Sequence, residues 1–206
     1  MTTQHIPAIG QPWPGQGGTY AGIMRGAPGL PDRHLIVPTA ASAPLGRLAW
    51  GAYGENEPNA VSEWDGQANT RALLASKHAH PAAEACAGLK IDGHSDFYLP
   101  SRRELLLCCA NVPELFDTAW YWSSTQHSRN GAFVQGFEHG NSFWNDEDLE
   151  HRVRACRGFT LEPLTTSAEG GEIKNSRISL ELEPAEAVHL AELLRASIAK
   201  TPRRRA

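Results

Sequence analysis

Oxygen-bearing side chains that could bind a metal gather late in the chain. They belong to Glu138, Asn141, Asp146 and Asp148, which lie close to one predicted turn. Calcium takes about six to eight oxygen ligands in proteins, so these residues could hold a calcium ion. The alternative is that the acidic residues are solvated loop side chains. The residue types leave both interpretations open.

Two other groups point to chemistry less strongly. His78 and His80 are two residues apart, so we expect their side chains to point away from each other, and no acid or cysteine has the spacing of a further ligand. Both histidines are therefore expected to be exposed. Ser123, Ser124 and Asp96 do not form the G-x-S-x-G motif of hydrolases. The sequence predicts no catalytic residues.

A ligand-binding surface is the stronger prediction. Residues 121–152 mix Tyr, Trp and Phe with Ser, His and Asn. This mixture is typical of binding loops, because rigid rings give contact area at low entropic cost. We predict these exposed ligand-binding residues: Gln126, His127, Arg129, Asn130, Gln135, His139, Asn141, Asn145 and Asp148. The alternative is that the aromatic residues form the core, since alternation along strands would bury about half of them in either case.

A helix that begins after Ser101 must position this segment. Ser101 and Glu104 have the spacing of a capping box, in which each side chain accepts a hydrogen bond from a backbone amide at the helix start. Residues 105–110 are apolar all round, which predicts a helix enclosed by the core. Asn111 and Pro113 end it.

The other elements follow from turn signals and periodicity. Residues 18–25 and 34–38 predict a β-hairpin, 47–53 a strand, and 119–159 a twisted antiparallel set with a single last strand over 152–159. Helices are expected from Asn69 or Thr70 to Ala75, and from Pro81 to Ala87. In the last part of the chain we expect a linker at 165–171, a strand at 178–182, an amphipathic helix at 184–199 and a basic tail at 203–205.

The composition is that of an ordinary globular protein. Of 206 residues 41% are hydrophobic and 20% charged, and the net charge of −4 argues against nucleic acid as a partner. The N-terminus lacks the pattern of a signal peptide, and no segment has the apolar length of a membrane span. We therefore expect synthesis in a bacterial cytoplasm, with the virion as a further location, and free thiols at all four cysteines.

Three sequence blocks carry a resemblance to a known family. "DFYLPSRREL", "YWSST" and "RVRACRGF" resemble the DUF1566 family, which is related to the C-terminal domain of the Legionella collagen-like protein and is similar to C-type lectins. The match covers residues 46–159. The N-terminal "PWPGQGGTYAGIMRG" is similar to proteins of Mu-like phages and prophages.

The resemblance implies an α+β fold with three parts. A C-type-lectin-like domain of two helices packed on a twisted antiparallel sheet would span residues 46–160. An N-terminal Gly/Pro-rich arm and β-hairpin, residues 1–45, would pack on it, and a strand–helix extension would occupy 161–206.

The resemblance also bears on individual sites. Trp144-Asn145-Asp146 matches a calcium-ligand signature of C-type lectins, which implies Asn145, Asp146 and Asp148 as ligands; no other cofactor is expected. Glu57-Pro58-Asn59 spells the sugar-selecting triplet but lies far upstream, so we carry no sugar specificity over. Cys86 and Cys156 match a lectin disulfide, which the reducing cytosol disfavours.

The sequence leaves two hypotheses for function. The first is a non-enzymatic phage or prophage recognition protein that binds a glycan or protein ligand, with residues 178–199 joining it to a second copy or a virion partner. The alternative is a virion structural or assembly protein, or an intracellular phage accessory factor. An enzyme related to the formylglycine-generating oxidases fits least, because no residues match that active site.

Overall fold

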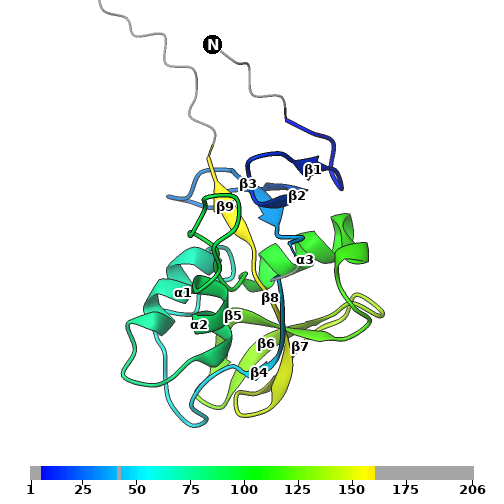
Figure 1. The fold of residues 1–206 in the computed structure, drawn as a ribbon. Coiled ribbons are helices and arrows are strands. Elements are labelled where there is room, and N and C mark those ends of the chain that lie inside the picture. Colours follow the sequence, from blue (N-terminus) through cyan, green and yellow to red (C-terminus); the bar gives the residue numbers. More distant parts are fainter. Residues whose placement is uncertain (1–5, 41–42, 161–206) are drawn as a thin grey trace, which may run out of the picture. The chain divides into compact units, whose positions relative to one another are not determined.

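Two β-sheets and three α-helices make up the part of the chain that the computed structural model describes, residues 6–40 and 43–160 (Figure 1). These residues belong to one unit, Met1–Pro163. The smaller sheet has the order β1-β2-β3-β9, with β1 Pro12–Trp13, β2 Gly18–Met24, β3 Arg33–Val37 and β9 Arg157–Phe159. The larger sheet has the order β4-β8-β5-β6-β7, with β4 Pro44–Ala49, β8 Glu150–Arg154, β5 Trp120–Ser128, β6 Gly131–Gly136 and β7 Ser142–Asp146. This is an α+β architecture.

Each helix begins at a clear start signal. α1 (Gly66–Leu74) is capped by the Asp65 carboxylate, which accepts from the Ala68 amide, whereas the sequence predicted a start at Asn69 or Thr70. α2 (Pro81–Ala87) begins at its proline as predicted. α3 (Arg102–Asn111) has the predicted capping box, and the 3-10 turn η1 (Pro113–Leu115) follows it.

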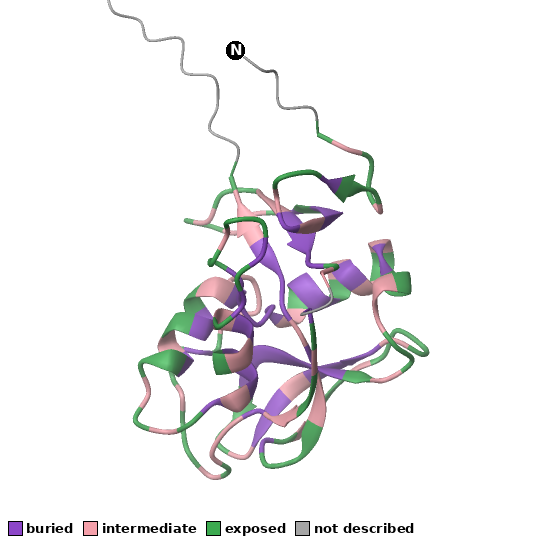
Figure 2. Ribbon diagram, in the orientation of Figure 1, coloured by how far each residue is buried: buried purple, intermediate pink, exposed green. Residues whose placement is uncertain are grey.

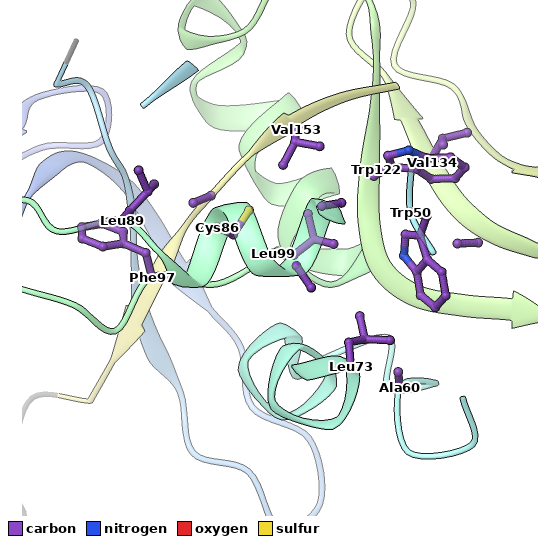
Figure 3. Close-up of a cluster of buried hydrophobic side chains, with 14 of the residues drawn as sticks. Trp50, Ala60, Leu73, Cys86, Leu89, Phe97, Leu99, Trp122, Val134 and Val153 are labelled. Atoms are coloured by element: carbon purple, nitrogen blue, oxygen red, sulfur yellow. The ribbon is translucent and has the colours of Figure 1, made fainter. Parts of the chain in front are cut away.

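The main core lies between the larger sheet and helices α1 and α2 (Figure 3). Trp50 and Trp122 are fully buried there, and Leu73, Leu99 and Val153 pack in the same cluster. Both indole groups donate to backbone carbonyls, Trp50 to Ser123 at 2.8 Å and Trp122 to Leu48 at 2.9 Å. The burial of these rings therefore leaves no unpaired N–H.

α3 lies between the two sheets. It contacts β2 of the smaller sheet and both β5 and β6 of the larger one. Leu105 and Cys108 are buried, whereas Leu106 and Ala110 are exposed. Figure 2 shows that α3 has both buried and exposed parts. The prediction of a helix enclosed on all sides was therefore wrong. One side of α3 faces solvent, and that side begins at Arg102 and Arg103.

The strand predictions were partly confirmed. β2 and β3 form the predicted antiparallel hairpin. The strand predicted over 47–53 is β4, Pro44–Ala49, and the chain then turns at Gly54, whose φ of 93° suits glycine. The single strand predicted over 152–159 was wrong, because Cys156 forms a bridge with Tyr98 and separates β8 from β9. β8 and β9 therefore belong to different sheets.

All four cysteines are free, as expected: Cys86, Cys108 and Cys156 are buried and Cys109 is half-buried. The lectin-type bridge between Cys86 and Cys156 is not formed. Burial raises the pKa of all four thiols. None of the helices in the described residues is long and apolar enough to cross a membrane. The linker, strand, helix and tail predicted beyond residue 160 lie outside the described residues.

Candidate functional site

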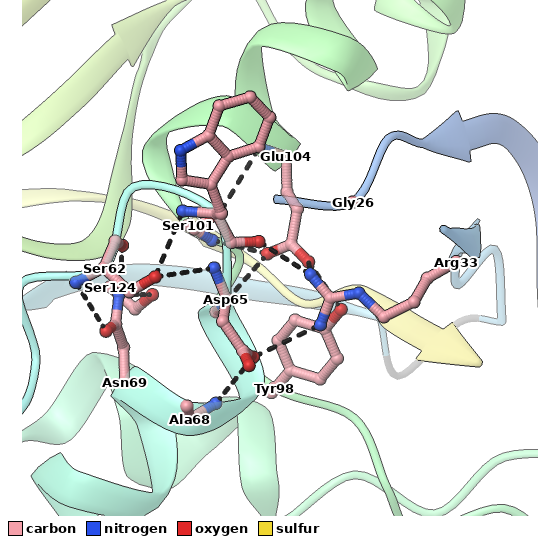
Figure 4. A network of polar contacts seen from close by, with 12 residues as sticks. Gly26, Arg33, Ser62, Asp65, Ala68, Asn69, Tyr98, Ser101, Glu104 and Ser124 are labelled. Carbon is pink, nitrogen blue, oxygen red and sulfur yellow. Dashed lines mark hydrogen bonds and ion pairs between the residues drawn. The ribbon is translucent and has the colours of Figure 1, made fainter. Parts of the chain in front are cut away.

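The start of α3 is fixed by a buried polar network (Figure 4). One oxygen of Glu104 accepts from the Tyr98 hydroxyl at 2.8 Å and from Arg33 at 3.2 Å; the other accepts from the amides of Ser101 at 2.8 Å and Gly66 at 3.2 Å. Burial raises the pKa of Glu104, although Arg33 and these hydrogen bonds oppose the shift. The network holds β3, α1 and α3 together, so the side chains at the start of α3 have a rigid base.

Two arginines extend from this base onto the surface. Arg102 and Arg103 share one carboxylate, that of Glu63, at 2.8 and 3.2 Å. The Arg102 guanidinium lies 4.2 Å from the centre of the Phe133 ring, and the Arg103 guanidinium lies 4.2 Å from the Trp64 ring. Each cation therefore covers an aromatic face, an arrangement that favours both partners.

The row of rings continues across β5, β6 and β7. His127 lies edge-on to Phe133, with 5.0 Å between ring centres, and stacks on Trp144 at 5.2 Å. Trp144 is followed by Phe143 at 5.7 Å, with nearly parallel planes. Phe143 is 57% exposed and Trp144 39%. We call the whole run the aromatic–arginine surface: Trp64, Arg103, Arg102, Phe133, His127, Trp144 and Phe143.

Strand pairing explains why these rings meet. Phe133 on β6 is directly opposite Trp144 on β7, so both side chains lie on one face of the sheet. A Cβ at Gly131 would approach the Trp144 ring to 2.9 Å, so the glycine leaves room for the indole. β7 is the outer strand of the larger sheet, and its rings have no neighbouring strand beyond them among the described residues.

The structure corrects two of the predicted ligand-binding residues. Gln126 and Gln135 are only 6% and 2% exposed, so the expectation that they are exposed was wrong. Gln126 accepts from the Glu57 amide at 2.7 Å and donates to the Glu55 carbonyl at 2.8 Å and the Glu147 carboxylate at 2.9 Å. It holds two loops together and has no free group for a ligand.

The remaining predicted residues are accessible but do not form one group. His127, Arg129, His139, Asn141 and Asp148 are exposed, and Asn130 and Asn145 are half-buried. Of these only His127 belongs to the aromatic–arginine surface. His139 and Asn141 instead join Glu138 and the exposed Trp120 around a small cavity of about 110 Å³.

The predicted calcium ligands are placed as follows. The Asn145 amide group lies 2.8 Å from His151 Nε2, while the Asp146 and Asp148 carboxylates are exposed and have no hydrogen-bond or ion-pair partner in the described part of the chain. Within residues 6–40 and 43–160, no three His, Cys, Asp or Glu side chains form a group that could hold a metal ion.

A second polar cluster was missed from the sequence. His78 Nδ1 and His80 Nε2 both approach one oxygen of Glu57, at 3.4 and 3.1 Å, so the two side chains converge rather than diverge. His80 is fully buried, contrary to expectation, because Glu57 and the Trp50 carbonyl satisfy its ring nitrogens. The net pKa of Glu57 is lowered. Burial alone would raise it, but the hydrogen bonds from Ser76, His80 and His78 outweigh the effect of burial.

This cluster borders an open polar pocket of about 310 Å³ that Glu55, Lys77 and Arg129 also line. The Ser76 hydroxyl donates to Glu57 at 2.6 Å. It is therefore bonded to a carboxylate instead of an imidazole, unlike the nucleophile of a Ser–His pair.

Glu147 is a further polar group that the sequence did not reveal. It is fully buried, and one of its carboxylate oxygens has no hydrogen-bond partner among the described residues. Burial raises its pKa to about 7, and the charges of Glu57 and Asp148 act in the same direction.

The arginines and Trp64 were also missed. The sequence did contain a signal, since Arg102 and Arg103 directly follow the cap Ser101 and must lie in the first turn of α3. The partner rings could not be assigned, because Trp64 and Phe133 are distant in the chain. Comparison with known proteins adds no relative, because the chain matches no protein-family model and no curated protein.

Proposed function

We propose that the described unit is a non-enzymatic recognition module that binds a glycan or protein ligand through the aromatic–arginine surface. The observation that carries the proposal is the continuous run of ring–ring and ring–guanidinium contacts that ends in the exposed Trp144 and Phe143. Trp and Arg side chains are enriched among the residues that contribute most to binding. The assignment to a phage or prophage, and to a C-type-lectin-like fold, rests on the sequence resemblance.

The geometry supports binding by a pre-formed surface. Arg102 and Arg103 are held by Glu63 and by the rings beneath them, and Arg102 also lies 3.3 Å from the Ser142 hydroxyl of β7. Side chains fixed before binding lose little conformational entropy when a ligand arrives. Rings suit the apolar faces of sugars or protein side chains, and the guanidinium groups suit polar acceptors.

The test is binding to a glycan array and to intact bacterial cells. The double variant Phe143→Ala/Trp144→Ala is expected to bind at least about thirtyfold more weakly, because truncation of aromatic anchors typically costs about 2 kcal/mol or more. Tyr53→Ala/Leu74→Ala is the matched control, since both residues are exposed apolar side chains outside this surface. Unchanged binding by the first variant would rule out the proposed surface.

A further inference from the structure

The outer edge of β7 is an unpartnered strand that carries apolar side chains. β7 pairs only with β6, so its second backbone edge faces no other strand in the described chain. Phe143 and Trp144 lie on it, and Leu149, in the turn that follows, is 46% exposed. Such an edge presents a row of free N–H and C=O groups to which another strand can pair.

The charge at the end of this strand is acidic. Asp146 ends β7 and Asp148 lies in the turn that follows. Both carboxylates are exposed, and neither has an ion-pair partner in the described residues. Arg129, in the neighbouring hairpin, donates to the Gly54 carbonyl at 2.9 Å.

We infer that β7 and the turn 146–150 bind an extended, cationic segment of a protein partner. This inference rests on the proposed function and names the class of ligand. The segment would add as a strand to the free edge of β7, with Lys or Arg side chains on the faces of Phe143 and Trp144 and close to Asp146 and Asp148.

The fold already contains this contact. Arg102 covers Phe133 and Arg103 covers Trp64, both at 4.2 Å, and Arg157 covers Phe159 at 4.7 Å; each of these guanidinium groups has a carboxylate beside it. In the part of the chain that the structure describes, no Lys or Arg covers the ring of Trp144 or Phe143, although Asp146 follows them on the same strand. A second copy of this chain fits the edge less well, because its own β7 carries the same carboxylates and like charges repel.

The experiment measures binding of short labelled peptides to the full chain by fluorescence anisotropy at low salt. The probe alternates Lys and Thr; its comparators are a Glu/Thr peptide and a Lys/Thr peptide with methylated backbone amides. The Lys/Thr peptide is expected to bind, more weakly as salt rises, and roughly tenfold more weakly to Asp146→Asn/Asp148→Asn and to Trp144→Ala. Amide methylation is expected to weaken binding, since strand addition needs the backbone donors.

Asp92→Asn/Glu114→Gln is the matched control, because both carboxylates are exposed and form no ion pair within residues 6–40 and 43–160. It should bind the Lys/Thr peptide as the parent chain does. Equal affinity of Asp146→Asn/Asp148→Asn for this peptide would overturn the inference, and so would equally tight binding of the Glu/Thr peptide. If a variant fails to fold, the backbone amide NMR chemical shifts of the parent chain test the inference instead. Addition of the peptide should change the shifts of β7 and of the turn that follows it. Changes located elsewhere would overturn the inference.

Two outcomes separate this inference from the proposed function. Recognition that is lost in Phe143→Ala/Trp144→Ala but unaffected in Asp146→Asn/Asp148→Asn overturns the inference and leaves the function standing. If the chain forms a concentration-dependent dimer and Trp144→Ala abolishes it, the edge of β7 binds a second copy of the chain. That result would overturn the inference of a cationic partner segment.

Discussion

Glu147 shows how a single buried carboxyl group can make stability depend on pH. Its pKa is raised to about 7, first by burial and then by the charges of Glu57 and Asp148, while the hydrogen bond from Gln126 opposes the shift. In the unfolded chain the group has an ordinary carboxyl pKa. The folded protein therefore keeps a proton that the unfolded chain loses between about pH 4.5 and 7, so the free energy of unfolding falls as pH rises through this window.

Glu147→Gln is expected to raise the free energy of unfolding at pH 8, by at most about 3 kcal/mol, and to change it little at pH 4. The amide cannot ionise, and it can still accept the hydrogen bond from Gln126. Urea unfolding at several pH values measures the difference. Glu114→Gln is the control, because that carboxylate is exposed and is not among the charges that shift the pKa of Glu147. A stability gain from Glu147→Gln that is the same at pH 4 and pH 8 would contradict this account.

The sequence could not predict which polar side chains are buried. Gln126, His80 and Glu147 have the residue types of a solvated loop, yet they are buried. The partners that allow Gln126 and His80 to be buried come from other segments: Glu55 and Glu57 for Gln126, Glu57 and Trp50 for His80. A buried polar group needs hydrogen bonds, and the pairing of distant loops that supplies them leaves no local pattern.

At the scale of elements, the local signals predicted some starts and stops but not the start of α1, which begins at Gly66 and not at Asn69 or Thr70. The capping box of α3, the proline at the start of α2 and the β2–β3 hairpin were all predicted from a few neighbouring residues. The division of residues 152–159 into β8 and β9 was not. Both halves alternate as strands do, and the division depends on the bridge between Cys156 and Tyr98, which are far apart in the chain.

The ion pair of Arg33 with Glu104 connects elements that are distant in sequence. Arg33→Ala leaves the fully buried Glu104 without a counter-charge, and we expect it to lower the free energy of unfolding at neutral pH by about 3–5 kcal/mol. Burial already raises the pKa of Glu104 with Arg33 present. The loss should therefore be smaller at acid pH, where Glu104 is protonated. Unfolding in urea at both pH values measures it.

Arg103→Ala is the matched control for this variant, because it removes an arginine from a half-exposed pair with Glu63. Exposed pairs typically contribute less than about 1 kcal/mol. Glu104→Gln added to Arg33→Ala should restore part of the stability at neutral pH. If Arg33→Ala and Arg103→Ala cost the same, the buried pair does not have the role assigned to it.

At the scale of the whole unit, the two ends of the described chain meet in one sheet. β9 pairs with β3, so the segment that precedes residue 46 and the last strand of the resemblance share hydrogen bonds. A second hydrophobic cluster joins Ala21, Leu35 and Val37 of the hairpin to Tyr98 and Cys108. The family resemblance covers residues 46–159 and rests on three short sequence blocks. It therefore does not predict that the N-terminal hairpin and β9 share a sheet.

A chain of residues 46–160 is therefore expected not to fold cooperatively. It would expose the cluster that Leu35 and Val37 cover, leave β9 unpaired and remove Arg33 from Glu104. Each large buried apolar side chain contributes about 1.5–3 kcal/mol, and domains are stable by only about 5–15 kcal/mol, so the combined loss approaches the whole stability. Thermal unfolding followed by circular dichroism measures it. A chain of residues 1–160 should melt in one sharp transition. A similar transition for residues 46–160 would contradict this expectation. It would mean that these residues fold without the hairpin and without the ion pair of Arg33 with Glu104.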